Sequence, residues 1–262
     1  MATHPHTVHV KTNLDSPLPA DMKSGILVAG FAPTRKSQMH RTIQFPLQPI
    51  GRLSVRAAGS QDEWADFAEA CGIIIIPDDK EAHLTVAYVD FDLQAFTAIA
   101  PDALTVFEWV SSRRVTDAAI TNIRHLTGLQ GLALWETSIG DETLFNLRHL
   151  SNLRWLDIGD TQITDVGLSY LSEMPLLYSL TLLNDRITDA GIAHLQRLPS
   201  LTHLDLMNTL VTDHGVATLK RLKGLRHLRV FGAGMTESGY RELKRALPGC
   251  RIWFHRSNDL PR

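Results

Sequence analysis

Leucine recurs at a fixed interval through the C-terminal half of this 262-residue chain. The recurring unit is 24 residues long, and one of its columns holds Leu129, Leu153, Leu177, Leu201 and Leu225. Two further apolar columns follow three and five residues later, at Leu132, Leu156, Leu180, Leu204 and Leu228 and at Leu134, Ile158, Leu182, Leu206 and Val230. The step of two between these columns places both side chains on one face of a short strand. The pattern therefore predicts one buried β-strand in every unit.

A second pattern, typical of a helix, follows each predicted strand. A Thr-Asp pair recurs at Thr116-Asp117, Thr164-Asp165, Thr188-Asp189 and Thr212-Asp213, and Gly140-Asp141 and Thr236-Glu237 occupy the same position in two other units. Apolar residues then follow at steps of three and four, as in Leu168, Leu171 and Met174. Threonine is a favourable N-cap, and an acidic residue in the first turn suits the positive end of the helix dipole. Each unit is expected to run strand, turn, helix and return loop.

A unit of this length cannot bury its own apolar face, so its stability depends on stacking against its neighbours. We therefore expect an α/β solenoid, with a curved parallel sheet on one side and helices on the convex side.

The units resemble leucine-rich repeats of the pattern LxxLxxLxLxxTxITDxGLxxLxxL, and the segment from Arg154 to Leu168 is the cleanest copy. The resemblance covers roughly residues 104–254. Similar repeats occur in many bacterial proteins and in the substrate-binding halves of F-box proteins. The resemblance implies a leucine-rich repeat solenoid that acts as a non-catalytic protein–protein interaction module. The column in which related repeats often carry asparagine differs here, since it holds Thr137, Thr161, Asp185, Thr209 and Ala233.

The residues before the repeats predict a different organisation. Residues 1–45 are rich in Pro, Thr, Ser, His and Lys without a sustained period, which indicates a disordered tail. Residues 46–103 are expected to form a small N-terminal α/β cap, with strands near 52–55, 73–76 and 84–89 and a helix over 61–70. The phase of the repeat continues through 81–104, which leaves open a degenerate first repeat there. The solenoid is then expected over 104–254, with a C-terminal tail at 255–262.

The face of the sheet opposite the helices is the predicted binding surface. Exposed aromatic and arginine residues dominate protein-binding hot spots. Partner-binding positions are expected at Trp109, Trp135, Trp155, Asp157, Leu183, His203, Asp205, Met207, His227, Arg229, Phe231 and Trp253. In this interpretation the apolar members anchor an extended partner segment, and the charged members set its polarity and register. The alternative is that the chain covers this face itself, for instance with the tail that contains Phe31, Phe45 and Pro46.

Charge is unevenly distributed although the formal net charge is only −2. Nine acidic residues and one lysine lie between Gln61 and Asp92, whereas the chain from Lys220 onward has eleven Lys and Arg residues and three acids. One interpretation of this asymmetry is an ordinary solvated surface. The functional interpretation is head-to-tail association of the chain, or binding of an acidic partner by the basic end. Nucleic-acid binding is not expected, because the basic residues lack a recognition motif.

The sequence argues against an enzyme. It contains no recognisable nucleophile motif or phosphate-binding glycine loop, and we expect no cofactor and no small-molecule substrate. His203, His227 and Asp205 are the one combination that resembles a metal ligand set, although side chains in one register also stack without metal. A second hypothesis, implied by the F-box resemblance, is the substrate-recognition subunit of a larger modifying complex. Cys71 and Cys250 do not make a disulfide framework, and no apolar stretch reaches the length of a membrane span, so a cytoplasmic location is expected.

Overall fold

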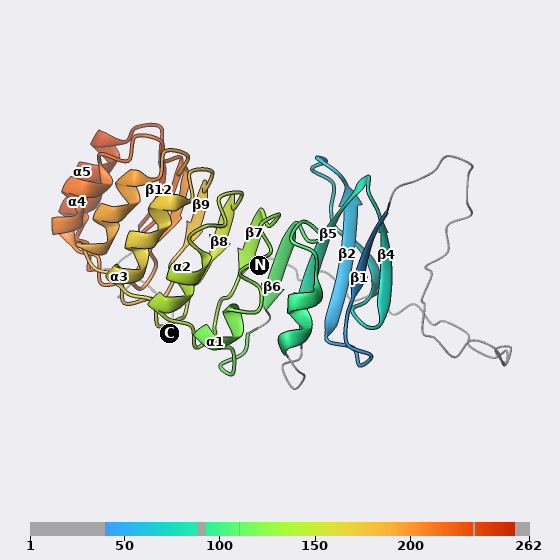
Figure 1. Ribbon diagram of the computed structural model, residues 1–262. Helices are drawn as coiled ribbons and strands as arrows, with labels where there is room; N and C mark the ends of the chain where they lie inside the picture. Colours follow the sequence, from blue (N-terminus) through green and yellow to red (C-terminus); the bar gives the residue numbers. More distant parts are fainter. Residues whose placement is uncertain (1–39, 88–92, 110, 233, 255–262) are drawn as a thin grey trace, which may run out of the picture.

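The computed structural model describes residues 40–87, 93–109, 111–232 and 234–254. Its main element is a ten-stranded sheet in the order β12-β11-β10-β9-β8-β7-β6-β5-β2-β3, and β1 and β4 form a separate antiparallel pair (Figure 1). The sheet is parallel from β5 to β12, and β2 pairs antiparallel with both β5 and β3. The strands are β1 His40–Gln44, β2 Gly51–Ala57, β3 Ala65–Glu69, β4 Ile73–Pro77, β5 Lys80–Val86, β6 Val106–Trp109, β7 Gly131–Ala133, β8 Trp155–Asp157, β9 Ser179–Thr181, β10 His203–Asp205, β11 His227–Arg229 and β12 Arg251–Trp253.

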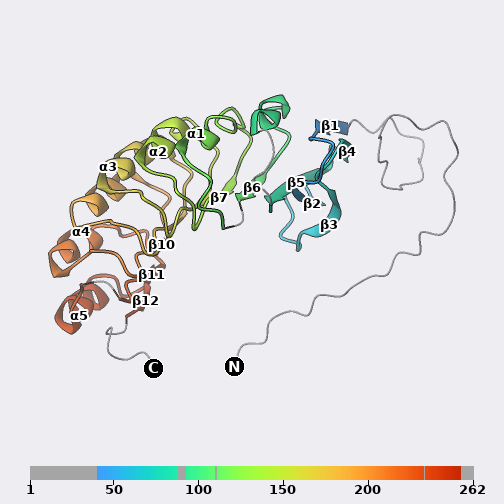
Figure 2. The same cartoon turned by 90° about the horizontal axis from the view of Figure 1, so that it is seen from below.

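The helices lie on the outer side of an arc and the strands on its inner side, as the view from below shows (Figure 2). They are short, and several are 3₁₀ rather than α, because a unit of 24 residues leaves only one or two turns for its return. They are η1 Leu93–Ala98, α1 Asp117–Ile120, α2 Asp141–Leu147, α3 Asp165–Leu168, η2 Ser169–Glu173, η3 Gly191–Arg197, η4 Asp213–Gly215, α4 Val216–Leu219 and α5 Glu237–Ala246. The α/β solenoid expected from the periodicity is confirmed.

One continuous hydrophobic core fills the space between strands and helices. It runs from Ile43 in the first described strand to Cys250, and the predicted leucine columns lie in it, with Leu132, Leu156 and Leu180 at most 1% exposed. Full burial of each such side chain stabilises the fold by about 1.5–3 kcal/mol. The core has no break between coils, so each unit is held by its neighbours.

Carboxylates of the recurring Thr-Asp pairs connect consecutive coils. Asp165 accepts hydrogen bonds from the backbone N–H and the hydroxyl of Thr188 in the next coil, at 2.8 and 2.5 Å. The Thr188 hydroxyl in turn accepts the N–H of Ala190, and the equivalent Thr164 hydroxyl accepts the N–H of Val166 in the N-cap role predicted from the sequence. The same bridge to the next threonine recurs from Asp141, Asp189 and Asp213. The aspartate therefore does more than complement a helix dipole, since it also holds the coils in register.

The turn after each strand requires a left-handed residue. Positive φ angles recur every 24 residues, at Glu136, Asp160, Asn184, Asn208 and Gly232. Asn, Asp and Gly adopt this conformation most readily, which explains why polar and small residues replace apolar ones in this column.

The N-terminal region differs from the sequence-based expectation in two places. The segment predicted as a helix over 61–70 contains the strand β3, because pairing with β2 outweighs the helix-like spacing of Trp64, Phe67 and Ala68. The last part of the predicted disordered tail forms β1, which pairs with β4, and Phe45 is 4% exposed. The rest of that tail, residues 1–39, and the predicted tail 255–262 lie outside the described residues.

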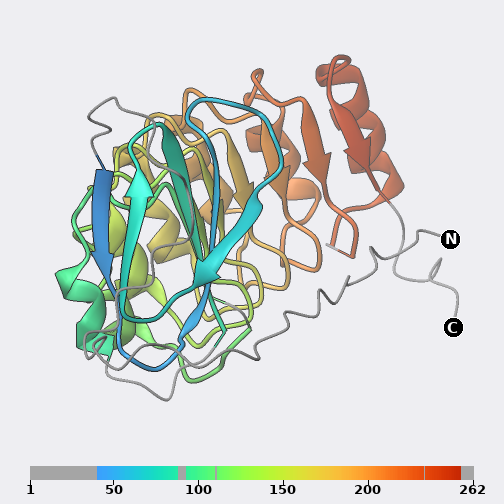
Figure 3. The ribbon, with the colours of Figure 1, turned by 90° about the vertical axis from the view of Figure 1, so that its right-hand side faces the viewer.

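The predicted α/β cap is built mainly of strands. Seen from the N-terminal end, β1 to β5 lie in front of the stacked coils (Figure 3). Strand β5 continues the parallel ladder of the solenoid, and the 3₁₀ helix η1 follows it with Phe96 buried. The region therefore joins the solenoid through a shared sheet. The predicted domain limits at residues 45, 103 and 254 stay predictions.

Candidate functional site on the concave sheet face

Two columns of side chains project from the concave face of the sheet. Strand register places His203 beside His227 and Arg251 in the first column, and Asp205 beside Arg229 in the second. Across the whole solenoid the first column contains His83, Val106, Gly131, Trp155, Ser179, His203, His227 and Arg251, and the second contains Thr85, Glu108, Ala133, Asp157, Thr181, Asp205, Arg229 and Trp253. Neighbouring members of a column are about 4.8 Å apart, the spacing of adjacent strands.

Trp109 does not belong to this face, and its assignment as a binding residue is wrong. Val106 pairs with Gly131, a step of 25 rather than 24 residues, so Phe107 is in register with the core residue Leu132. A shift of one residue turns every side chain of a strand to the opposite face. Trp109 is 0% exposed, and its ring packs edge-to-face on Phe96 and Phe107.

A row of rings crosses the C-terminal end of the face. The imidazoles of His203 and His227 are stacked with centroids 4.3 Å apart and planes at 15°. The Trp253 indole stacks on His227 at 5.6 Å, and the Tyr178 ring meets His203 edge-on at 6.0 Å. The Arg251 guanidinium lies 4.7 Å above the Trp253 ring. The structure thus brings together His203, His227 and Trp253 from the predicted set. It adds Tyr178, which precedes β9, and Arg251, which shares the column of His203 and His227.

This row borders a shallow groove of about 230 Å³, whose lining includes Asp205 and Arg229. Arg229 donates a hydrogen bond to Asp205 at 2.8 Å. Burial raises the pKa of Asp205, while the Met207 N–H and the Arg229 charge lower it. Asp205 is only 8% exposed, so its carboxylate orients Arg229 and offers little surface to a partner.

The middle of the face is acidic. Burial raises the pKa of Asp157; the Gly159 N–H opposes this change, whereas the nearby carboxyl groups of Asp205 and Glu108 add to it. These three acids occupy alternate strands of one column, with small residues between them. The face therefore changes from acidic at β6 to β8 to basic at β11 and β12.

The Trp155 indole lies across the neighbouring strand. A β-carbon added at Gly131 would lie 2.2 Å from the Cε2 atom of this ring, so the glycine makes room for the indole. Trp155 lines a polar cavity of about 560 Å³ between the concave strands and the loop around Trp64. Sequence reasoning missed this cavity, because Trp64 was placed on a helix.

Side chains around this cavity are held by one another. The Arg56 guanidinium lies 4.4 Å above the Trp64 ring and donates a hydrogen bond to Glu81 at 2.8 Å. His83 contacts the edge of Trp64 and lies 3.1 Å from the Glu108 carboxylate. The loop is thereby fixed against the start of the concave face.

The remaining predicted residues follow the strands in the turn at the rim of the face. Trp135 is 44% exposed, whereas Leu183, Met207 and Phe231 are half-buried. The backbone ladder continues through this position, where the Asn184 N–H donates to the Met207 carbonyl at 2.9 Å. The three aliphatic and aromatic side chains extend the surface without adding charge.

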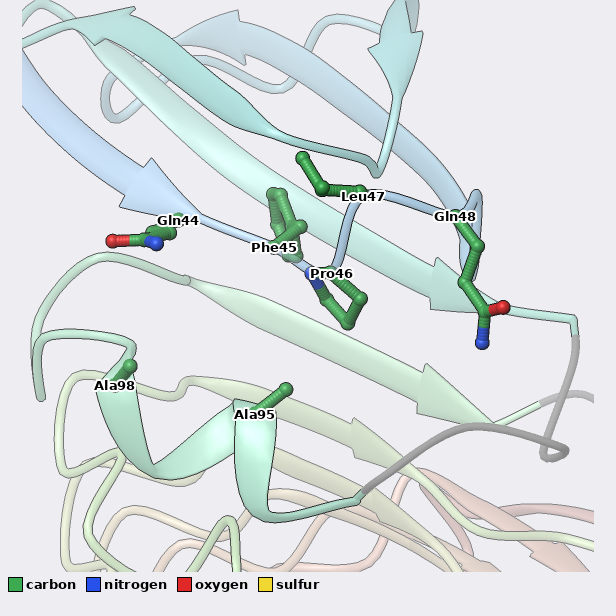
Figure 4. Close-up of a pocket in the computed structure, with 7 residues that line it drawn as sticks. All are labelled: Gln44, Phe45, Pro46, Leu47, Gln48, Ala95 and Ala98. Atoms are coloured by element: carbon green, nitrogen blue, oxygen red, sulfur yellow. The ribbon is translucent and has the colours of Figure 1, made fainter. Parts of the chain in front are cut away.

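A larger cavity lies away from these columns. It measures about 650 Å³ and lies between the segment that follows β1 and the helix η1, where Figure 4 shows Phe45, Pro46 and Leu47 opposite Ala95 and Ala98. Leu47 is 88% exposed, and the lining has no charged side chain. Volume alone does not make a site, and the concave face has the convergent charged and aromatic groups that recognition requires.

Among the described residues, no three His, Cys, Asp or Glu side chains are grouped so as to hold a metal ion. The rings of His203 and His227 stack face to face. The Nδ1 atom of His203 lies 2.8 Å from the Thr202 hydroxyl, so this nitrogen already has a hydrogen-bond partner. Within the described ranges, none of the helices has both the length and the apolar character needed to cross a membrane.

Comparison with known proteins gives one family match. A family model described as Leucine Rich repeat matches residues 149–172, which is the length of one unit. No curated protein matches the chain.

Three solved bacterial structures are similar in fold. The chain is 19% identical to a leucine-rich repeat protein of Leptospira interrogans, with a TM-score of 0.44 over 62% of this chain and 38% of that one. It is 21% identical to internalin C2 of Listeria monocytogenes, with a TM-score of 0.48 over 63% and 66% of the two chains. For internalin F of the same organism the identity is 20% and the TM-score 0.42, over 65% and 58%. The chain spans less than two thirds of the length of each of these structures.

The family match covers the unit that contains β8, and copies of that unit stack in register on both sides of it. The leucine columns, the inter-coil aspartates and the left-handed turns recur with the same period. These observations show that the chain folds as a solenoid of the leucine-rich repeat type.

Proposed function

We propose that this chain is a non-catalytic protein–protein interaction module whose concave sheet face binds a segment of a partner protein. The observation that carries the proposal is the composition of the two concave columns. Aromatic rings and charged groups gather there, whereas the opposite face of strands β7 to β11 carries the buried leucine column. An open face of this kind is typical of an interaction surface in repeat proteins.

Anchors and polar groups alternate across the face in a way that suits an extended segment. Trp155 and Trp135 offer apolar surface near β7 and β8, and Phe231 and Trp253 offer it near β11 and β12. Asp157 lies on β8 itself, two residues after Trp155, and Arg229 lies on β11. An extended chain crossing the strands would meet an apolar contact, then an acidic stretch, then a basic one. This order defines a direction for the partner.

The experiment is affinity capture with the immobilised full chain, followed by quantitative mass spectrometry. Retention of a specific partner is expected to fall at least about tenfold for Trp155→Ala combined with Phe231→Ala, since a hot-spot truncation costs about 2 kcal/mol or more. Phe145→Ala is the matched control, because Phe145 is 45% exposed on the convex helix α2. If the double variant and the Phe145→Ala control retain the partner equally well, the concave face is not the binding surface.

Coverage of the face by the chain's own N-terminal residues is tested in the same assay. A version lacking residues 1–39 keeps β1, which pairs with β4 and belongs in the fold. Stronger capture by this version would indicate that the removed residues compete with the partner. Unchanged capture would indicate that they do not occupy the face.

The recognition-subunit hypothesis predicts a tightly associated enzyme that co-purifies with the chain. The described residues before the repeats form strands rather than a helical bundle, so no observation specifically favours it. The cytoplasmic location expected from the sequence is part of our proposal, and cell fractionation would test it.

A further inference from the structure

The stacked histidines at the C-terminal end of the concave face form an unusual arrangement of titratable groups. His203 and His227 are direct cross-strand neighbours on parallel strands, and their rings overlap at 4.3 Å. Tyr178 and Trp253 contact the outer sides of the pair, so neither ring can turn away without losing a ring contact. Any charge placed on one imidazole therefore lies directly against the other.

The charged groups that face this pair come from three strands. Strand β10 contributes Asp205, β11 contributes Arg229, and β12 contributes Arg251, while β9 presents the uncharged Ser179 and Thr181. Asp205 is already held by Arg229 at 2.8 Å. Two arginines and one aspartate thus give this end of the face one net positive charge when both imidazoles are neutral, and three when both are protonated.

Protonation of His203 is opposed in the free protein. Burial lowers the pKa of His203, and the charge of His227 lowers it further. Like charges within a few ångströms disfavour each other's charged form unless an opposite charge is supplied. Among the described residues, the carboxylate that faces the pair is engaged by Arg229, and an acidic ligand would supply the compensating charge.

We infer that the groove along β10 to β12 binds an acidic segment of a partner protein, and that His203 and His227 take up protons when it binds. The inference rests on the proposed function, and it specifies the partner's chemistry at one end of the face. Binding is then tighter in mildly acidic conditions, because the ligand stabilises the protonated pair.

The dimensions fit a peptide in extended conformation. Three adjacent strands span about 10 Å, and two side chains three residues apart in an extended chain of the polyproline II type lie on the same side at a similar separation. The groove of about 230 Å³ is too small and open for a larger enclosed ligand. Eleven Lys and Arg residues against three acids from Lys220 onward would also steer an acidic segment toward this end.

The test is isothermal titration calorimetry of the full chain with a ten-residue Gly/Ser peptide that carries glutamate at every third position. The same peptide with lysine in place of glutamate is the charge control. We expect the glutamate peptide to bind about tenfold more tightly at about pH 6 than at about pH 7.5, a coupling of the usual size for linked sites. Repeating the titration in two buffers of different ionisation enthalpy measures the protons taken up.

Two variants distinguish protonation of the histidine pair from other effects of pH on the affinity for the peptide. In the double variant His203→Gln with His227→Gln the affinity should no longer depend on pH, whereas His194→Gln, on the convex helix η3, should behave like the original chain. Circular dichroism checks that the double variant is folded. If the double variant is unfolded, NMR of the original chain replaces it. The imidazole resonances must then titrate at higher pH with the peptide than without it.

Several results would overturn the inference. They are equal affinity for the two peptides, binding to the glutamate peptide that does not change with pH, or unchanged imidazole titration in the complex. Capture of a partner that depends on Trp155 but shows no preference for acidic sequence would leave the proposed function in place and remove only this inference.

Discussion

Asp185 is the residue whose replacement tests our account of this fold most directly. Its side chain is 2% exposed, and it occupies the turn column in which neighbouring repeats carry buried threonines. Its Oδ1 accepts the backbone N–H of Thr161 at 2.8 Å and lies 3.0 Å from the Thr161 hydroxyl. Its Oδ2 is buried without a hydrogen-bond partner among the described residues. A carboxylate in this position is poorly solvated.

Burial raises the pKa of Asp185 from 3.8 to about 7, and the carboxylates of Asp160 and Asp157 add to the effect. The hydrogen bonds from Thr161 oppose it. The folded state therefore binds a proton more tightly than the unfolded state. This group stabilises the fold fully below about pH 4, and its contribution is lost as the pH rises toward and through about 7.

The size of the effect follows from the difference between the two pKa values. At about 1.36 kcal/mol for each pKa unit, the rise from 3.8 to about 7 corresponds to a loss of about 4 kcal/mol at high pH, as an upper figure. Between about pH 5 and about pH 8 the expected loss is about 2.5 kcal/mol. Asp185→Asn removes the titration and keeps the acceptor for the Thr161 N–H.

Urea denaturation of the original chain and of Asp185→Asn at these two pH values measures the effect. The difference in unfolding free energy between the two proteins should shift in favour of the variant by about 2.5 kcal/mol on going from the lower to the higher pH. Asp62→Asn, at an exposed position, is the matched control. If Asp185→Asn and the original chain show the same dependence on pH, the buried, unsatisfied carboxyl is not the cause and the reasoning fails.

Three further predictions test the packing of the coils and the face. Trp109→Ala should destabilise the fold by about 3–5 kcal/mol, as expected for a large core aromatic, whereas Trp135→Ala should change the unfolding free energy by less than about 1 kcal/mol. If urea titrations give the opposite order, the assignment of Trp109 to the core is wrong. Asp189→Ala should cost about 2–3 kcal/mol, because two charge-assisted hydrogen bonds to the next coil are lost, and a cost near zero in thermal denaturation would show that the carboxylate does not join the coils. Gly131→Ala should shift the Trp155 fluorescence, because the added methyl group overlaps the indole, and an unchanged spectrum would mean that the ring does not rest on β7.

The repeat itself was predictable because its cause is local and periodic. A strand that buries alternate side chains and a helix that buries every third or fourth impose their spacing on the sequence, and 24-residue copies make that spacing visible. Threonine N-caps were predictable for the same reason, since the cap and the N–H that it accepts are two residues apart, as in Thr164 and Val166.

Contacts between neighbouring coils could not be predicted from the sequence in the same way. The bond from Asp165 to Thr188 joins residues separated by almost one full unit, so neither residue alone signals it. The position of the Trp155 indole depends likewise on Gly131 in the preceding coil, where the lack of a side chain leaves room for the ring.

Trp109 and β3 show where the tertiary structure overrules the pattern. The loop between β6 and β7 has one residue more than the others, and this single residue reverses which side chains of β6 face the core. The segment 65–69 has a spacing compatible with a helix, yet β2 has a free edge whose backbone groups need partners, and pairing there fixes it as a strand. Sequence thus determined the unit and the stacking of its apolar faces, because these follow from local periodicity. Register, and with it the identity of the exposed side chains, was decided only when strands distant in sequence met in one sheet.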